Sequence, residues 1–365
     1  MIRPRCAWLA LASAAFVSLA CGPDPSPPQR NGLRVEVIAT NLNVPWSLAI
    51  APDGRVFVAE RPGRIRVIVH DTLAKDIWAT IPVVDGTPHN WETGLMGLAL
   101  HPDFARNPYV FVCYTTASSH GFINRVARLR ERDGHGDSLS VLVDEIPAGW
   151  YHNGCRVKIG PDEKLYITTG DSYRELPAQN ESSLAGKVLR LNLDGSIPSD
   201  NPIPRSPVWS LGHRNPQGIT WNPETGIAYL TEHGSGVDDE INMLRRGGNY
   251  GWPNARGQAA DPRYRDPAFV FHRAPTGATF IPGAFVGRSD MLVASLSGHL
   301  MRFSVAGDAV SLLDDSVLVG YGRLRDVAIG PHGSVYVSTS NRDGRGHPRR
   351  GDDRILRIWM NGALP

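Results

Sequence analysis

The sequence predicts an all-β protein built from repeated units, and two observations support this fold class. Glycine and proline number 38 and 29 in 365 residues, or about 18% of the chain, against a usual value of roughly 12%. Such a composition is typical of a chain with many tight turns and argues against a helical bundle. In addition, one turn-and-strand pattern recurs along the chain with a nearly constant period.

The recurring pattern is a turn that contains Pro-Asp-Gly or a variant, followed by an alternating strand, a second turn and another strand. Its prolines lie 50, 59, 62 and 108 residues apart, at Pro52, Pro102, Pro161, Pro223 and Pro331. The longest interval has room for two repeats, and two strands without a proline are expected in its middle, at 290–303. The chain therefore contains six units of about 50–60 residues.

Repeats longer than roughly 40 residues hold four strands each, so the sequence predicts a six-bladed β-propeller of four-stranded antiparallel blades. A large β-sandwich would not explain the fixed period. The strand expected at 33–39 would close the ring by joining the last blade. Residues 33–362 then form one domain of six blades, although the length alone would suggest two domains.

The first 20 residues are expected to be an export signal, because two arginines precede a short apolar stretch. The run Leu19-Ala20-Cys21-Gly22 resembles a bacterial lipoprotein processing site, so we expect a lipid anchor at Cys21. An ordinary cleaved signal, in which Cys21 has no role, is the alternative. The Pro-rich segment within 21–32 would tether the domain. We therefore expect an exported protein, a periplasmic or cell-envelope lipoprotein that contacts the membrane only through this anchor.

Charge and cysteine content narrow the possible functions. The formal net charge of +2 is too balanced for a protein that binds nucleic acid by neutralising phosphates. Cys113 and Cys155 are the cysteines of the predicted domain at 33–362. An exported protein can form a disulfide between them, but two buried free thiols are an equal alternative at this stage.

In a propeller, the loops that flank the innermost strands meet around the central channel. Four of these segments carry unusual polar residues, namely Glu92, His152, Arg214 with Asn215, and Arg323 with Arg325. The last two alternate along a strand and so share one of its faces. The segment 231–254 is acidic and rich in glycine, which suits a hard cation such as calcium. Each feature alone has a structural explanation, but together they suit an anionic cofactor and proton abstraction.

Four segments carry a resemblance to a known family. GLMGLALHPDF at 94–104, GKVLRLNLDGSIPSDNP at 186–202, GHRNPQG at 212–218 and DDEINMLRRGGNYGWP at 238–253 resemble signatures of the soluble quinoprotein glucose/sorbosone dehydrogenases. That family includes bacterial aldose sugar dehydrogenases that use pyrroloquinoline quinone (PQQ). The resemblance extends from about 33 to 360 and implies a six-bladed propeller with the quinone over its central channel.

The resemblance also implies roles for single residues. His152 matches the general base that takes the hydroxyl proton at the anomeric carbon of an aldose, whose hydride then passes to PQQ. Arg214 matches the arginine beside the reactive carbonyl of the quinone, and Asn215 matches an asparagine that contacts the cofactor. The cofactor's carboxylates would be bound by Arg323 and Arg325. Glu92 lies where the family has Gln or Glu near cofactor and substrate.

The family's calcium is held by main-chain carbonyls, here those of Gly234 and Ser235. One residue departs from the family pattern: Ser297 occupies the position of a lysine that contacts the quinone. Either cofactor binding is weakened, or a neighbour such as His299 or Arg302 supplies the missing positive charge.

The leading hypothesis is therefore a PQQ- and Ca²⁺-dependent dehydrogenase of aldose sugars that passes electrons to a periplasmic acceptor. Two alternatives remain at this stage. One is a calcium-dependent sugar lactone hydrolase, and the other is a non-catalytic surface propeller that binds a protein or a glycan.

Overall fold

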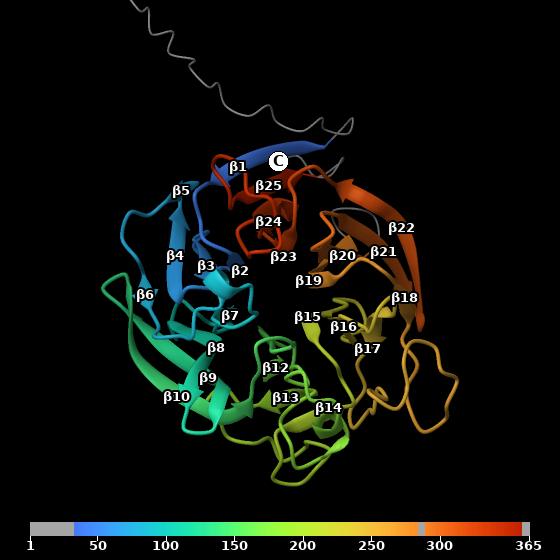
Figure 1. The fold of residues 1–365 in the computed structure, drawn as a ribbon. Coiled ribbons are helices and arrows are strands. Elements are labelled where there is room, and N and C mark those ends of the chain that lie inside the picture. Colours follow the sequence, from blue (N-terminus) through green and yellow to red (C-terminus); the bar gives the residue numbers. More distant parts are fainter. Residues whose placement is uncertain (1–32, 284–288, 360–365) are drawn as a thin grey trace, which may run out of the picture.

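The structure, a computed structural model, describes residues 33–283 and 289–359. Six sheets are arranged in a ring like the blades of a propeller, five with four strands and one with five (Figure 1). This confirms the predicted six-bladed β-propeller of antiparallel blades. The expected signal, Cys21 and the tether lie outside the described residues, so the prediction of a lipoprotein is not tested by the fold.

Each blade has its innermost strand at the central channel and its other strands successively farther out. In this order, the first contains β2 (Pro45–Ile50), β3 (Val56–Glu60), β4 (Arg64–Val69) and β5 (Thr72–Leu73), with β6 (Ala79–Thr80) also paired to β4; the second contains β7 (Leu95–Leu100), β8 (Tyr109–Ser118), β9 (Gly121–Arg132) and β10 (His135–Pro147); the third contains β11 (Gly154–Ile159), β12 (Leu165–Thr169), β13 (Lys187–Leu191) and β14 (Val208–Leu211).

The remaining blades complete the ring. The fourth contains β15 (Pro216–Trp221), β16 (Ala228–Glu232), β17 (Asp239–Met243) and β18 (Phe269–Phe271); the fifth contains β19 (Pro275–Ile281), β20 (Asp290–Ser295), β21 (Leu300–Ala306) and β22 (Ala309–Leu318); the sixth contains β23 (Leu324–Ile329), β24 (Val335–Thr339), β25 (Ile355–Trp359) and β1 (Arg34–Ala39). Three 3-10 helices, η1 (Thr87–His89), η2 (Leu176–Gln179) and η3 (Pro331–Gly333), lie between strands. Among the described residues, no helix is long and apolar enough to cross a membrane.

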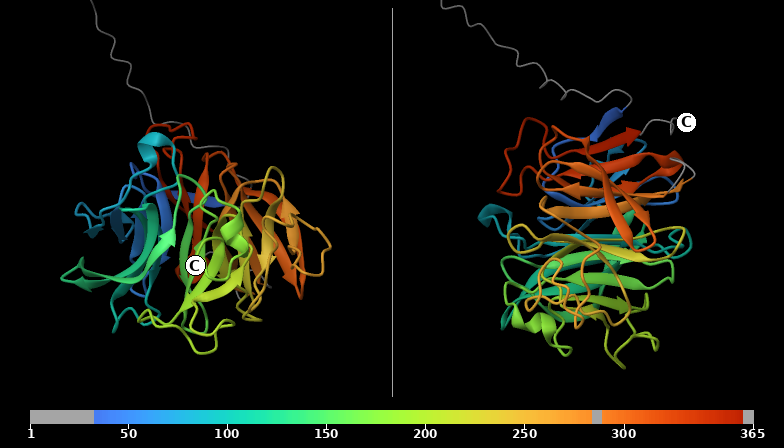
Figure 2. Two further views of the ribbon diagram at one scale, coloured as in Figure 1. Left: turned by 60° about the horizontal axis from the view of Figure 1, so that its bottom comes forward. Right: turned by 90° about the vertical axis from the view of Figure 1, so that its right-hand side faces the viewer.

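The two ends of the domain close the ring together. Strand β1 pairs antiparallel with β25, with Val35 opposite Ile358 and Val37 opposite Leu356. The first and last segments accordingly lie side by side at one edge of the ring (Figures 1 and 2). The prediction that residues 33–39 join the last blade is confirmed. Since the outer strand of this blade comes from the opposite end of the chain, the ring cannot open without breaking a sheet.

The repeated prolines lie in the turns that lead from the innermost strand of a blade to its second strand. Pro52, for example, lies between β2 and β3, and Pro331 lies between β23 and β24. The six innermost strands therefore begin on the opposite face of the ring, where the second strands end. We call this opposite face the site face, because the polar residues singled out in the sequence lie at these strand ends.

An ion pair fills the axis of the ring. Arg156 of β11 and Asp326 of β23 are fully buried, and Nη1 of the arginine lies 2.9 Å from Oδ2 of the aspartate. The same guanidinium donates hydrogen bonds to the Gln217 carbonyl on β15, at 2.8 Å, and to the Ser47 hydroxyl on β2, at 3.0 Å. Asp326 in turn accepts a hydrogen bond from the Leu48 amide at 2.8 Å. Four of the six innermost strands are thus linked across the channel.

A fifth innermost strand, β19, takes part in this arrangement through a glycine. A Cβ atom added to Gly277 on β19 would lie 1.9 Å from a carboxylate oxygen of Asp326. The glycine therefore leaves the space that the buried carboxylate occupies. Trp46 covers the pair from β2, with the Arg156 guanidinium 4.1 Å from its ring centre.

We predict that Arg156→Met lowers the free energy of unfolding by about 3–5 kcal/mol, because the variant leaves Asp326 charged and unpaired in the core. The double variant Arg156→Met/Asp326→Asn removes that charge and keeps an oxygen for the Leu48 amide. It should therefore be more stable than the single variant. Urea unfolding of the three proteins checks this, and a double variant that is no more stable than Arg156→Met would contradict it.

Candidate active site

Four arginines line a cleft on the site face. They are Arg61 after β3, Arg323 and Arg325 at the beginning of β23, and Arg345 in the loop between β24 and β25. We call this the arginine cleft. Two carboxylates, Glu92 and Asp343, are its acidic lining residues, so positive charge prevails there. A cleft of this kind favours an anionic ligand.

Arg323 and Arg325 come together as the sequence suggests, although Arg323 precedes β23 and the pairing of β23 with β24 shifts its register between Leu324 and Asp326. Both guanidinium groups contact Oδ2 of Asp343, at 2.8 and 3.3 Å. Arg325 is buried, and burial together with the positive charges of Arg323 and Arg61 lowers its pKa to about 9. An anion bound in the cleft would oppose this shift, because it stabilises the charged guanidinium.

Glu92 connects the arginine cleft to the predicted base. One carboxylate oxygen accepts a hydrogen bond from the His152 amide at 2.9 Å, and the other accepts one from Arg345 at 3.3 Å. Burial by itself would raise the pKa of Glu92. The positive charge of Arg345 and the hydrogen bond from His152 outweigh burial, and the pKa is lowered. Glu92 is therefore held as a carboxylate between the two sides of the site.

His152 is oriented by a residue that the sequence did not single out. Its Nδ1 lies 2.8 Å from Oδ1 of Asp171, which follows β12. Oδ2 of Asp171 accepts a hydrogen bond from the Trp252 indole at 2.9 Å. When Nδ1 donates its proton to Asp171, Nε2 is the ring nitrogen left to accept one. The pair thus has the arrangement of a general base with its orienting carboxylate.

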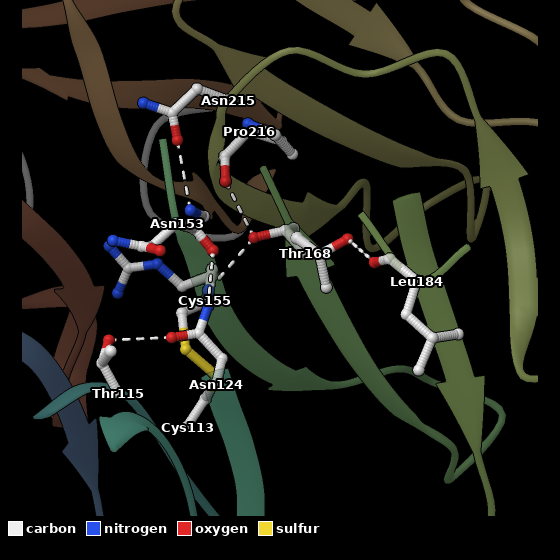
Figure 3. The surroundings of a disulfide bond; sticks show 12 residues. Cys113, Thr115, Asn124, Asn153, Cys155, Thr168, Leu184, Asn215 and Pro216 are labelled. Atoms are coloured by element: carbon white, nitrogen blue, oxygen red, sulfur yellow. Dashed lines mark hydrogen bonds between the residues drawn. A yellow bond between two sulfur atoms is a disulfide. The ribbon is translucent and has the colours of Figure 1, made fainter. Parts of the chain in front are cut away.

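A disulfide anchors the loop that carries His152. Cys113 on β8 and Cys155 on β11 are bonded, with their Cα atoms 5.5 Å apart, and both are fully buried (Figure 3). Of the two alternatives left open by the sequence, the structure thus contains the disulfide. The disulfide connects the second blade to the third, and Cys155 lies three residues after His152.

Hydrogen bonds hold the same loop from both sides (Figure 3). The Asn153 carbonyl accepts one from Asn124 of the second blade, at 3.3 Å. The Gly154 amide donates one to Oδ1 of Asn215, at 3.2 Å. The loop also contains two non-glycine residues with left-handed backbone, His152 at φ 56° and Cys155 at φ 67°. Such conformations persist where the surroundings determine them, as at many functional sites.

Arg214 contacts one of the two carbonyls that the resemblance assigns to calcium, that of Gly234. Its guanidinium donates hydrogen bonds to the His233 carbonyl at 3.2 Å and to the Gly234 carbonyl at 2.6 Å. The Arg214 amide is held by the buried carboxylate of Glu232. The ring of Trp252 lies 5.3 Å from the guanidinium. Since a carbonyl oxygen has two lone pairs, Gly234 can bind the arginine and still ligate a cation.

Three buried polar atoms around the site have no hydrogen-bond partner among the described residues. They are Nδ2 of Asn215, Nε of Arg214 and Nε2 of His233. Burial lowers the pKa of His233 to about 4, so its ring is neutral near pH 7. Unpaired buried polar atoms are unfavourable, and three of them around one cleft are what a polar ligand would satisfy.

Ser297, at the position of the family's lysine, and the two neighbours that were expected to supply a positive charge there make other contacts. Ser297 is exposed, and its hydroxyl lies 2.6 Å from that of Ser295. Arg302 cannot supply the charge, because it is paired with Asp290 at the beginning of β20, the end away from the site face. His299 contacts the Asp315 carbonyl at 2.8 Å.

Arg61 and Arg345 are two further arginines that line the arginine cleft. Arg61 is buried and donates to the carbonyls of Trp91 and Thr93. Arg345 reaches across the cleft to Glu92.

The acidic segment after β16 has a structural role. Asp239 accepts hydrogen bonds from the amides of Gly234, Arg273 and Ala274, at 2.7–3.1 Å, and so holds the loop that presents the Gly234 carbonyl. Glu240 is bound by the Asn242 amide group and the Gly257 amide. In the described part of the chain, no group of three or more His, Cys, Asp or Glu residues could hold a metal.

Several residues of this site were not predicted from the sequence, namely Arg61, Asp171, His233, Asp343 and Arg345. Arg61 and His233 immediately follow the second strand of a blade, and Asp171 lies two residues beyond one. The signal was present in the repeats themselves, because segments such as VFVAER, YITTGD and YLTEH end in polar residues at equivalent places.

A pH dependence follows from Glu240. Burial and the neighbouring charge of Glu232 raise its pKa from 4.5 to about 8. Between these values the folded protein keeps the proton that the unfolded chain releases, so the free energy of unfolding falls as pH rises. We predict that Glu240→Gln removes this part of the pH dependence. Urea unfolding of the unaltered protein and the variant at pH 5 and pH 8 measures this dependence. An equal change in the free energy of unfolding between the two pH values in both proteins would contradict the prediction.

Comparison with known proteins agrees with the geometry. The Glucose / Sorbosone dehydrogenase family model matches residues 42–356. The aldose sugar dehydrogenase YliI of Escherichia coli is 30% identical over 356 residues, which cover 86% of this chain and 91% of that protein. Quinoprotein glucose dehydrogenase B of Acinetobacter calcoaceticus is 36% identical over 262 residues, 63% of this chain and 54% of that one.

A solved structure is equally similar. The PQQ-bound aldose sugar dehydrogenase of Streptomyces coelicolor matches with a TM-score of 0.81 and 35% identity, covering 91% of this chain and 99% of that chain. The family model spans nearly all of the propeller, and both whole-length comparisons lead to sugar dehydrogenases. The chain therefore belongs to the glucose/sorbosone dehydrogenase family.

Proposed function

We propose that the protein is a PQQ- and Ca²⁺-dependent dehydrogenase that oxidises the anomeric carbon of aldose sugars. The observation that carries this proposal is the His152–Asp171 pair, which lies beside a cleft lined by four arginines. One part can accept a proton from a sugar hydroxyl, and the other presents guanidinium groups to an anionic cofactor. Sugar dehydrogenases among the relatives support the reaction class.

His152 is the proposed general base. Asp171 holds Nδ1, so Nε2 is free to take the proton of the anomeric hydroxyl. As that proton leaves, the electron pair of the O–H bond forms the carbonyl of a lactone and hydride leaves the anomeric carbon. When bound, PQQ supplies the two-electron acceptor for this hydride. Asp171 then stabilises the imidazolium that His152 becomes.

The residues around the cleft fit an anionic quinone. Arg323 and Arg325 offer guanidinium groups for its carboxylates, and Arg61 and Arg345 offset the absence of a cation at Ser297. Nδ2 of Asn215 and Nε of Arg214 have no partner among the described residues and could donate hydrogen bonds to cofactor oxygens. Arg214 would stabilise negative charge on the reactive carbonyl. Glu92 would lie between cofactor and sugar.

Calcium is proposed at the carbonyls of Gly234 and Ser235. The loop that presents Gly234 is held by Asp239, and the oxygen ligands of the main chain suit a hard cation. The protein's own contribution at this point would be two carbonyls, with the cofactor and solvent completing the coordination sphere.

Export to the periplasm or cell envelope, with a lipid at Cys21 and a periplasmic electron acceptor, is also part of the proposal. The Cys113–Cys155 disulfide supports it, because structural disulfides persist in oxidising compartments. Mass spectrometry of the protein from a membrane fraction would detect the lipid on Cys21.

We predict that purified protein supplied with PQQ and Ca²⁺ reduces a dye when an aldose is added. His152→Ala should abolish turnover, and Asp171→Asn should lower kcat by about 10²–10⁴-fold, because the imidazole loses its orienting carboxylate. Both variants should still bind PQQ, measured by absorbance titration, since neither residue lines the arginine cleft.

Other outcomes would favour the alternative functions. Hydrolysis of a sugar lactone without added PQQ would indicate a lactone hydrolase. Absence of PQQ binding and of turnover across a broad sugar panel would indicate a non-catalytic binding propeller. Turnover that His152→Ala leaves intact would contradict the assignment of the base.

A further inference from the structure

A buried ammonium group lies in the third blade and does not line the arginine cleft. Lys187 is the first residue of β13 and is fully buried. Its Nζ donates hydrogen bonds to three main-chain carbonyls, those of Pro177 at 2.9 Å, Ala178 at 3.0 Å and Ala185 at 2.6 Å. Since an ammonium has three N–H groups, these carbonyls use all of them. Lys187 thus fills a cradle of oxygens in the way that a bound cation would.

The burial of this charge needs a reason, because an ammonium loses its hydration in the core. Arg190, three residues further along β13, is buried against two carboxylates, those of Asp162 and Asp200. Lys187 has carbonyl partners instead. Burial lowers the pKa of Lys187 to about 7, while hydrogen bonds to its charged form act in the opposite direction. An apolar side chain would avoid the cost of burial, so we attribute the retained charge to the carbonyls that it binds.

Two of these carbonyls belong to the short helix η2. The last carbonyls of a helix have no partner within it, and a lysine side chain can bind them. Leu176 at the beginning of η2 is 81% exposed, whereas Ala178 is fully buried. Gly186 lets η2 approach the blade, because a Cβ atom there would lie 2.6 Å from that of Ala178. The ammonium of Lys187 therefore fixes η2 against β13.

η2 in turn is connected to both main-chain polar groups of Trp252. The Gln179 side chain donates a hydrogen bond to the Trp252 carbonyl at 2.7 Å. The Ala178 carbonyl, which Lys187 binds, also accepts a hydrogen bond from the Gly212 amide at 3.0 Å. The Gly212 carbonyl then accepts one from the Trp252 amide at 3.0 Å. Two short routes thus join the ammonium to Trp252.

Trp252 supports the residue that orients the proposed base. Its indole donates a hydrogen bond to Oδ2 of Asp171 at 2.9 Å, and Oδ1 of the same carboxylate lies 2.8 Å from Nδ1 of His152. Contacts at both oxygens fix the plane of the carboxylate. The direction of the His152 ring therefore depends on Trp252, and the position of Trp252 depends on η2.

We propose that Lys187 is a positioning residue for His152: its ammonium acts as a built-in cation that fixes η2 and, through Trp252, the carboxylate that orients the base. This inference rests on the proposed function, since it takes His152 as the base. Lys187 itself would contact neither cofactor nor sugar. Its charge, rather than its bulk, carries the role.

The indole proton of Trp252 reports on this route without PQQ and without turnover. At pH 6, where most of Lys187 is charged, Lys187→Met should make this proton exchange with solvent about 10-fold faster, because its contact with Asp171 opens more often. NMR measures the exchange. Arg190→Met is the matched control, because it removes a buried cation from the same strand, and it should leave the exchange unchanged. Equal acceleration in both variants would overturn the proposal.

Chemical rescue separates charge from bulk. Lys187→Ala leaves space where the side chain was, and propylammonium can place a charged group against the three carbonyls. It should restore slow exchange of the Trp252 indole proton. The neutral molecule 1-propanol has a similar size and should not restore it. Equal restoration by both molecules would contradict a role for the charge.

A kinetic test uses the PQQ-loaded protein. Lys187→Met should lower kcat by about 10–100-fold and leave the affinity for PQQ unchanged, because misplacement of the base acts on the chemical step. Gln179→Leu keeps Lys187 and removes the contact with the Trp252 carbonyl, so it should change both quantities in the same way. This second variant tests the route even where Lys187→Met does not fold.

The outcomes separate this proposal from the proposed function. If Lys187→Met accelerates indole exchange but the unaltered protein oxidises no sugar, the positioning of Asp171 by Lys187 stands and the dehydrogenase assignment fails. If sugars are oxidised and Lys187→Met changes neither the exchange nor kcat, Lys187 is not a positioning residue. Faster exchange with an unchanged kcat would likewise overturn the proposal.

Discussion

The Arg156–Asp326 ion pair at the axis of the ring is the interaction on which the rest of the structure depends. It connects β11 to β23 and, through Ser47, Leu48 and Gln217, also holds β2 and β15. The same strands carry the site: Arg325 directly precedes Asp326, and His152 lies four residues before Arg156. Because the pair fixes where these strands begin, it also fixes the distance between the base and the arginine cleft. Closure by β1 and β25 keeps that geometry from opening at the edge.

The blades could be predicted from the sequence because each repeat is local: its proline turn and its alternating strands lie within about 60 residues. That Arg323 and Arg325 lie together was expected from the alternation of side chains along a strand. The register shift between Leu324 and Asp326 shows that simple alternation does not hold there. The partners of His152 and Glu92 were not predicted from the sequence. Arg345 lies 253 residues after Glu92, and their contact exists only once the ring is closed. Asp171 lies 19 residues after His152, just beyond the strand that pairs with β11, so this contact forms within one blade. The fate of the two cysteines was also undetermined, because they lie on different blades.

The site combines two environments with different charge. The arginine cleft is cationic, and a buried ring nitrogen of His233, one of its lining residues, has no partner among the described residues. A second cavity, beside His152, is lined by aromatic residues and has Arg174 as its one charged lining residue. His152 lies between them, bound to Asp171 and anchored by the disulfide that begins at Cys155. An anionic cofactor and a neutral sugar could thus approach the same base from different sides. Arg61 and Arg345 add to the positive charge of the cleft.

The central claim is that His152 serves a reaction in which the anomeric C–H bond of a sugar is broken. Single-turnover reduction of the PQQ-loaded protein by glucose deuterated at C1, compared with glucose deuterated at C2, tests this most directly. We expect slower reduction with the C1 label, an unchanged rate with the C2 label, and one lactone formed for each quinone reduced. Equal rates with both labels, or reduction without lactone, would contradict it.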